Sequence, residues 1–159
     1  MSAVSEQTVR LRIIGIGSPF GADRLGWRVA ECLERSNQLR SMPGAAWEVL
    51  IRDRPGVMLL NDLRGVERAV LIDAMCSNSE IGRVRCLTVE EAITHYGLCS
   101  SHGFGLGEAL SLGRVLGDLP RELSIFGVEI PFDGVGLSND EFELMACQAA
   151  ELIEGEFPG

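Results

Sequence analysis

The chain alternates short strand-like segments with helix-like segments, and this alternation constrains its fold more than any other feature. Residues 9–16 end in a nearly continuous apolar run, which is typical of a strand buried on both faces of a parallel sheet. A glycine-bearing loop follows, and apolar residues at helical spacing then extend to about Ser36. The alternation continues with strands predicted at 47–52, 68–73, 83–89 and 122–130 and with helices predicted at 57–63, 104–116 and 138–154, the last begun by a capping box of Ser138 and Glu141.

This order of elements predicts an α/β protein, a three-layer sandwich with a mostly parallel, twisted five-stranded sheet and helices on both faces. No linker, repeat or low-complexity stretch interrupts the 159 residues, a length that suits one ordinary domain. We therefore expect residues 1–159 to form a single domain.

Composition excludes several classes of function. The start of the chain is polar, and no stretch approaches the roughly 20 apolar residues that span a bilayer, so neither a secretion signal nor a membrane segment is expected. A net charge of −9 opposes binding to nucleic-acid phosphates. The cysteines are odd in number, scattered and never spaced C-x-x-C, which favours a reducing, cytoplasmic compartment over a disulfide framework: Cys32, Cys76, Cys86, Cys99 and Cys147.

The first loop carries Gly15, Gly17 and Gly21 directly after a strand, which invites a dinucleotide-binding interpretation with Asp53 as the acid on the ribose. The spacing is not G-x-G-x-x-G, however, and Asp23 stands at the helix start, where its carboxylate would repel a pyrophosphate.

Two carboxylates and one imidazole form the candidate site. Asp23 precedes a predicted helix and, taken alone, has a simpler interpretation as its N-cap. Asp73 ends a predicted strand, and His102 stands at the start of another helix. Because ligands of open α/β sheets bind beyond the carboxyl ends of the strands, both aspartates belong at the same edge. Two carboxylates and an imidazole suit a hard to borderline metal ion. His95 lacks an acidic partner of this kind and is expected to be a surface or packing residue.

An ordered set of motifs covering most of the chain resembles the [NiFe]-hydrogenase maturation endopeptidases. The set comprises Ile14-Gly15-Ile16-Gly17-Ser18-Pro19, Asp23-x-x-Gly26 with Arg28-Val29-Ala30, Val70-Leu71-Ile72-Asp73-Ala74 and Ser101-His102-Gly103-Phe104-Gly105-Leu106.

The resemblance implies that the family's metal-contacting positions fall on Asp23, Asp73 and His102, and that its usual acid after the second strand falls on Asp53. The chain departs from the family pattern at Ser18, where Asn is common, and in a loop that is one residue shorter and holds one acid rather than two. Alignment from Gly26 backwards makes Asp23 the ligand, whereas alignment from Gly15 forwards selects Arg24. A guanidinium cannot ligate a metal, which favours Asp23.

The resemblance also implies an activity: removal of the C-terminal extension of a nickel-loaded [NiFe]-hydrogenase large-subunit precursor. The nickel would be supplied by the precursor, and no organic cofactor is expected. The catalytic group is not identified, because G-x-S-x-G and H-E-x-x-H are absent and Cys99 is more typical of a buried small residue. Asp23, Asp73 and His102, with Asp53, are the candidates. Two other interpretations stay open: a non-enzymatic nickel-binding or metallochaperone module, and a nucleotide-dependent oxidoreductase using the loop from Gly15 to Gly21.

Overall fold

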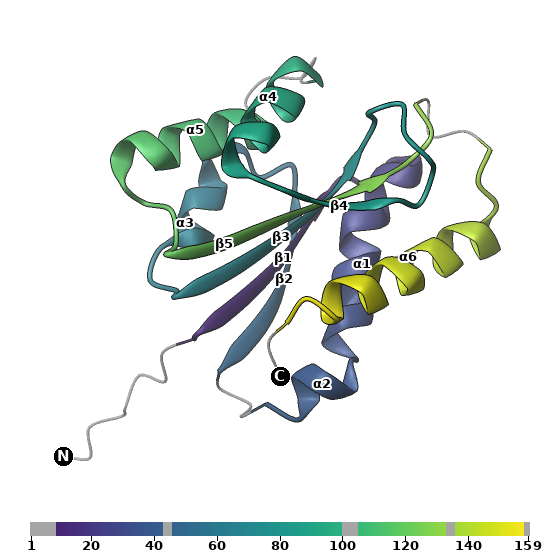
Figure 1. The fold of residues 1–159 in the computed structure, drawn as a ribbon, viewed down its shortest axis with the longest axis horizontal. Coiled ribbons are helices and arrows are strands. Elements are labelled where there is room, and N and C mark those ends of the chain that lie inside the picture. Colours follow the sequence, from purple (N-terminus) through teal and green to yellow (C-terminus); the bar gives the residue numbers. More distant parts are fainter. Residues whose placement is uncertain (1–8, 43–45, 100–104, 133–135, 158–159) are drawn as a thin grey trace.

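The computed structural model describes residues 9–42, 46–99, 105–132 and 136–157 and contains a five-stranded sheet with helices on both faces (Figure 1). The strands lie in the order β2-β1-β3-β5-β4, and only the pairing of β4 with β5 is antiparallel. The strands are β1 (Leu11–Gly17), β2 (Trp47–Asp53), β3 (Arg68–Met75), β4 (Val84–Leu87) and β5 (Glu122–Glu129). The fold class predicted from the sequence is therefore confirmed.

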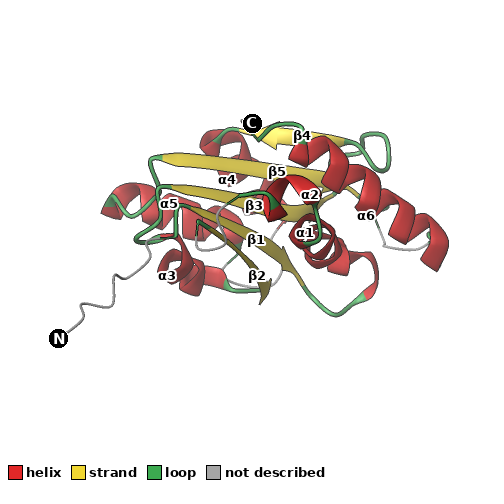
Figure 2. Ribbon diagram, turned by 90° about the horizontal axis from the view of Figure 1, so that it is seen from below, coloured by secondary structure: helices red, strands yellow, loops and turns green. Residues whose placement is uncertain are grey.

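Helices α1 (Leu25–Glu34) and α6 (Asn139–Glu154) cover one face of the sheet, together with the short α2 (Asn37–Arg40) (Figure 2). Helices α3 (Leu59–Leu63), α4 (Val89–Cys99) and α5 (Leu106–Leu116) cover the other. Each face has its own apolar core. Strand β3 contributes to both by alternation, since Val70 and Ile72 pack beneath α1 while Leu71 and Met75 pack beneath α4 and α5.

Some elements differ from the sequence prediction. Helix α4 was not predicted, because the preceding strand was extended to residue 89, whereas it ends at Leu87. A local signal for α4 exists: the backbone N–H of Glu91 donates to the Thr88 hydroxyl, and the Thr88 N–H donates to the Glu91 carboxylate, which is a capping box. The predicted helix at 57–63 is a 3-10 turn (η2, Gly56–Met58) that leads into α3. The capping box of Ser138 and Glu141 is confirmed.

The strand order creates a switch point between β1 and β3. From β1 the chain passes through α1, on one face of the sheet, to β2, which pairs with one side of β1. From β2 it returns through α3, on the other face, to β3, which pairs with the opposite side of β1. The helices on the two faces diverge there, which leaves space beyond the carboxyl ends of β1 and β3. A short 3-10 helix, η1 (Gly21–Arg24), lies at this place and contacts both strands.

Helix α1 approaches the sheet very closely at Gly26. A Cβ atom on Gly26 would overlap the Ile16 carbonyl oxygen and lie 2.7 Å from the Ile72 carbonyl oxygen. A Cβ on Gly15 would lie 2.7 Å from the Cβ of Ala30. The first turn of α1 therefore rests directly on the backbone of β1 and β3, and this contact sets the position of η1.

Replacement of Gly26 by alanine should push α1 away from both strands, because backbone atoms cannot move aside as a side-chain end can. We expect Gly26→Ala to lower the free energy of unfolding by about 3 kcal/mol in urea denaturation. Gly155→Ala is the matched control: its φ of −62° suits alanine and its Cβ would lie 3.4 Å from the nearest atom. A change within about 0.5 kcal/mol is expected there. Equal stability of the two variants would contradict the close contact.

Candidate active site

The loop between β1 and α1 folds back on itself and presents Asp23 at the switch point. The Ser18 N–H donates to the Asp23 carbonyl at 3.3 Å, and the Asp23 N–H donates to the Phe20 carbonyl at 3.2 Å. The buried Ser18 hydroxyl donates to the Asp23 carboxylate. These bonds hold the Asp23 side chain in one orientation, half-buried beside the strands.

Asp23 is not a helix cap. Neither η1 nor α1 has a side-chain cap bond at its N-terminus, and the Asp23 carboxylate accepts from Ser18 instead. The N-cap interpretation considered for Asp23 is therefore wrong, and Ser18 is a contributor that sequence reasoning missed. Its position, five residues before the aspartate in a glycine-bearing loop, was the only local signal.

Asp73 lies in β3 on the face that it shares with Leu71 and Met75, opposite Gly127 of β5 in the strand register. Burial raises the pKa of the Asp73 carboxyl well above its ordinary value, and the charge of Asp23 raises it further, although a hydrogen bond from the Ala74 N–H acts in the other direction. The turn η1, which holds Asp23, contacts β3, which holds Asp73, so the two carboxylates lie close enough to influence each other. Their role in one functional site stays a prediction.

Asp53 lies at the same edge but faces the solvent. It is opposite Gly17 in the register of β1 and β2, and its carboxylate accepts from the Arg54 guanidinium at 2.8 Å. Arg54 has a φ of 41°, unusual for a residue other than glycine, and its N–H donates to the Gly17 carbonyl at 2.9 Å. Its guanidinium also lies 5.5 Å from the ring centroid of Phe20. Arg54 thus ties the end of β2 to the loop that holds Asp23.

A second buried carboxylate at this edge, Glu129, was missed in the sequence. It is 1% exposed, and its oxygens accept from the Ser77 N–H and hydroxyl, both at 2.7 Å, and from the Ser79 N–H at 3.2 Å. Burial would raise its pKa, but these hydrogen bonds lower it, with a net shift below the ordinary value. Glu129 therefore anchors the loop that follows β3. An acidic residue ending an otherwise apolar strand was the signal for it.

Of the two histidines, His95 lies within the described residues and His102 does not. His95 is half-buried in α4 with its ring edge-on to Tyr96 at 4.8 Å, and its pKa is lowered chiefly by burial, consistent with a packing role. His102 lies outside the described residues, in the segment 100–104 that connects α4 to α5. Within the described part of the chain, no three His, Cys, Asp or Glu side chains gather in a way that would hold a metal ion. The structure thus brings together Asp23 and Asp73, and His102 stays a prediction.

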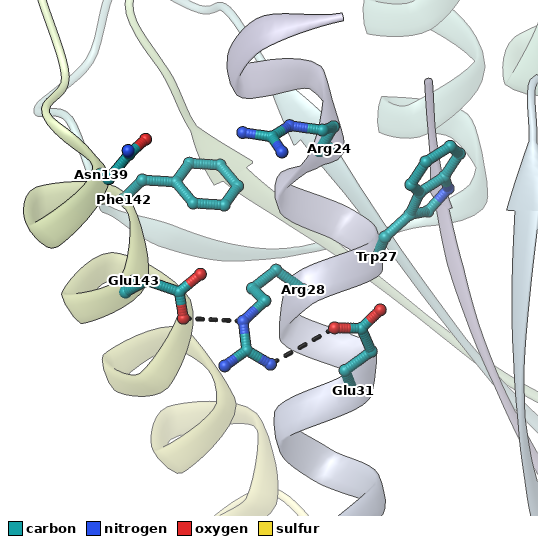
Figure 3. A pocket seen from close by; sticks show the side chains of 7 residues that line it. All are labelled: Arg24, Trp27, Arg28, Glu31, Asn139, Phe142 and Glu143. Carbon is teal, nitrogen blue, oxygen red and sulfur yellow. Dashed lines mark hydrogen bonds and ion pairs between the residues drawn. The ribbon is translucent and has the colours of Figure 1, made fainter. Parts of the chain in front are cut away.

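A groove of about 360 Å³ between α1 and α6 begins next to this site (Figure 3). Arg24, the residue after Asp23, has its guanidinium 5.3 Å from the ring centroid of Phe142 at one end of the groove. Further along, Arg28 bonds Glu143 at 2.7 Å and Glu31 at 3.3 Å. The groove is therefore polar, and an ion pair joins its two walls.

The first loop does not suit a dinucleotide. A pyrophosphate needs backbone N–H groups directed outward at the helix start, but those of Ser18 and Asp23 are bonded inside the loop. Gly17 serves packing instead, since a Cβ there would overlap the Asp23 carbonyl oxygen, and Gly21 has a φ of 56°. No helix in the described ranges is long and apolar enough to cross a membrane.

The fold is that of an α/β protein in which two aspartates, Asp23 and Asp73, lie at the switch point of the sheet, and comparisons with known proteins agree on its family. The family model for hydrogenase maturation protease (HycI) matches residues 28–153, a range that includes Asp73 and His102 and begins after Asp23. The chain therefore belongs to the hydrogenase maturation protease family, whose members are peptidases.

Individual relatives are similar over most of their lengths. The chain is 29% identical over 123 residues to the hydrogenase 2 maturation protease of Escherichia coli K12, covering 76% of this chain and 73% of that protein. It is 28% identical over 131 residues to the hydrogenase expression/formation protein HupD of Bradyrhizobium diazoefficiens, covering 81% of this chain and 66%, just under two thirds, of HupD.

Among solved structures, this chain resembles an endopeptidase from E. coli with a TM-score of 0.74 and 26% identity, covering 91% of this chain and 90% of that one. The hydrogenase-maturating endopeptidase HybD of E. coli has the same fold, with a TM-score of 0.69, 24% identity and the same coverage.

The raised pKa of Asp73 makes a prediction about stability. The folded protein keeps this proton to a higher pH than the unfolded chain does. Above about pH 4 the unfolded state therefore ionises first, which stabilises it relative to the folded state. The free energy of unfolding of the wild type should therefore fall, relative to Asp73→Asn, as the pH rises above about 4, and the difference should level off once the raised pKa is passed. Urea denaturation over a pH series measures this; parallel curves would contradict the pKa shift.

Proposed function

We propose that the protein is an endopeptidase that removes the C-terminal extension of a nickel-loaded [NiFe]-hydrogenase large-subunit precursor in the cytoplasm. In this proposal Asp23, Asp73 and His102 contact the nickel held by the precursor. The observation that carries the proposal is the packing of η1, which holds Asp23, against β1 and β3 at the switch point, where β3 holds Asp73. The raised pKa of Asp73 agrees with this arrangement. Membership of the hydrogenase maturation protease family supports the class of substrate.

The electrostatics of the two carboxylates give a physical reason for dependence on nickel. Without a cation, the charge of Asp23 and the burial of Asp73 both oppose ionisation of Asp73. A divalent ion between the two groups reverses this balance, because it attracts both carboxylates at once. A precursor that lacks nickel offers no such gain, so the same two residues select the loaded precursor.

The ligand chemistry agrees with a metal that arrives with the substrate. Two carboxylate oxygens and one imidazole can add to an ion that the precursor already holds, because borderline metals accept both oxygen and nitrogen ligands. An ion placed there can also polarise the scissile carbonyl or an attacking water. The α1–α6 groove, whose lining begins at Arg24, the residue after Asp23, offers the precursor a surface of charged and aromatic side chains.

Substitutions that preserve shape test these residues. Asp23→Asn can keep the hydrogen bond from Ser18 but offers no anionic oxygen, so we expect the variant to keep its melting temperature and lose processing. Asp73→Asn and His102→Ala should also lose processing. The measurement is the mass of a nickel-loaded precursor after incubation with each variant.

Asp118→Asn is the matched control, because this carboxylate is bonded to Arg64 at 2.9 Å, just beyond the end of α5, and should process at the wild-type rate. Processing by Asp23→Asn at the wild-type rate would remove Asp23 from the site and leave the alignment of the first loop unsettled. A non-enzymatic nickel-binding module would leave the precursor at full length with every form of the protein, wild type included.

Metal content gives an independent test. We expect the purified protein to contain little stoichiometric metal and to bind added Ni²⁺ weakly, since the proposed ligands include no thiolate and the ionisation of Asp73 is opposed by burial and by the charge of Asp23. Processing should depend on nickel in the precursor and should survive treatment of the protease with a chelator. Tight one-to-one metal that remains after chelator dialysis, measured by elemental analysis, would contradict the view that nickel belongs to the substrate.

A further inference from the structure

Two cysteines meet between α1 and α6, although 115 residues separate them in the sequence. The two helices lie side by side on one face of the sheet (Figures 1 and 2). The sulfur atoms of Cys32 and Cys147 are 3.8 Å apart, and both are reduced. Because the sequence gives no sign of this pairing, the two residues were counted among the scattered cysteines.

Polar contacts on both sides fix the register of the two helices at the cysteines. Four residues earlier on each helix, Arg28 bonds Glu143 at 2.7 Å (Figure 3). Beyond the end of α1, the Ser36 hydroxyl donates to Glu154 at 2.8 Å. The cysteine pair therefore lies between two fixed points.

The distance between the thiols suits a cross-link. A disulfide needs the sulfur atoms to be about 2.05 Å apart. Rotation of the two side chains, with a small shift of one helix, can bring the sulfur atoms to that distance. The contacts on either side limit any larger rearrangement.

The two thiols differ in accessibility. Cys147 is exposed, whereas Cys32 is half-buried. Burial raises the pKa of the Cys32 thiol to about 11, helped by its hydrogen bond with Cys147, and the nearby Arg28 lowers it only in part. An incoming reagent therefore meets Cys147 first, with Cys32 as the second thiol.

We propose that Cys32 and Cys147 form a redox modification site, at which low-molecular-weight disulfides convert the two thiols into a reversible covalent link between α1 and α6. The Cys147 thiolate attacks one sulfur of the small disulfide and releases one small thiol, which leaves a mixed disulfide on Cys147. The sulfur of Cys32 then attacks Sγ of Cys147, loses its proton and displaces the second small thiol. Two protein thiols are oxidised to one disulfide, and one small disulfide is reduced to two thiols.

This site does not depend on the proposed proteolytic function. In a reducing compartment the pair stays a dithiol, and the link forms when the ratio of small disulfide to thiol rises. It joins the helix that follows Asp23 to its neighbour without using any group of the candidate active site.

Glutathione disulfide is a suitable probe. The full-length protein is incubated with increasing ratios of oxidised to reduced glutathione, quenched with acid, alkylated, digested and mapped by mass spectrometry. We expect one cross-linked peptide pair that contains Cys32 and Cys147 and is lighter by two hydrogen atoms than the two separate thiol peptides together. Cys32→Ser should instead accumulate a glutathione adduct on Cys147, and Cys147→Ser should form no such link. Cys86→Ser, which replaces another exposed cysteine, should behave like the wild type.

The melting temperature provides the second measurement. Closing a loop of this length restricts the unfolded chain, so oxidised wild type should melt higher than reduced wild type by on the order of 5–10 °C, and Cys147→Ser should show no such shift. The proposal is overturned if Cys32 and Cys147 both remain open to alkylation at ratios that modify Cys86. A lower melting temperature of the cross-linked protein would likewise overturn it, because the link would then strain the helices.

Discussion

The contact between the first turn of α1 and the backbone of β1 and β3 is the constraint on which the rest of this structure depends. Gly26 rests on the carbonyl groups of Ile16 and Ile72, and no side chain could be accommodated there. Because the helix is so close, the preceding turn η1 must lie against the end of β3, and Asp23 is brought to Asp73. This placement disfavours ionisation of Asp73, and the packing energy of α1 and its core offsets that cost.

Comparison of the two buried acids at this edge indicates which one is available for chemistry. Glu129 accepts three hydrogen bonds from Ser77 and Ser79, and its pKa is lowered, so its charge is already satisfied within the protein. Asp73 has one backbone donor and a carboxylate neighbour, and its pKa is raised. A group whose charge the protein leaves unsatisfied gains most from an external cation. An environment that disfavours ionisation of a carboxyl group is more frequent at functional sites than in the rest of a fold.

The layers and the edge of the sheet that carries the site could be predicted from the sequence, because both follow from local periodicity and from one rule of topology. The alternation of segments indicated the sheet, and the positions of Asp23 and Asp73 after parallel strands placed them at one edge.

The conformation of the first loop could not be predicted in this way. The loop in which the Asp23 carboxylate accepts from Ser18 is also held by Arg54, which directly follows β2 and donates its N–H to the Gly17 carbonyl. The partners of Glu129 lie about fifty residues away, and those of Cys32 more than a hundred. Helix α4 is different, since Thr88 and Glu91 carried a local signal for it that was not used.

The proposed ligand set bears on how the protein could discriminate between substrates. Asp23, Asp73 and His102 include no thiolate, and the burial of Asp73 and the charge of Asp23 both oppose ionisation of Asp73 when no cation is present. Such a set would bind a cation usefully only when other ligands contribute, as those of a precursor would. In the proposed function, discrimination would come from a difference between two states of the same partner: nickel would favour the ionised form of both carboxylates, and a precursor without nickel would not. A stronger site would bind free metal and lose this dependence on the partner, so in this proposal the weakness of the isolated site and the selectivity for a loaded precursor have the same physical origin.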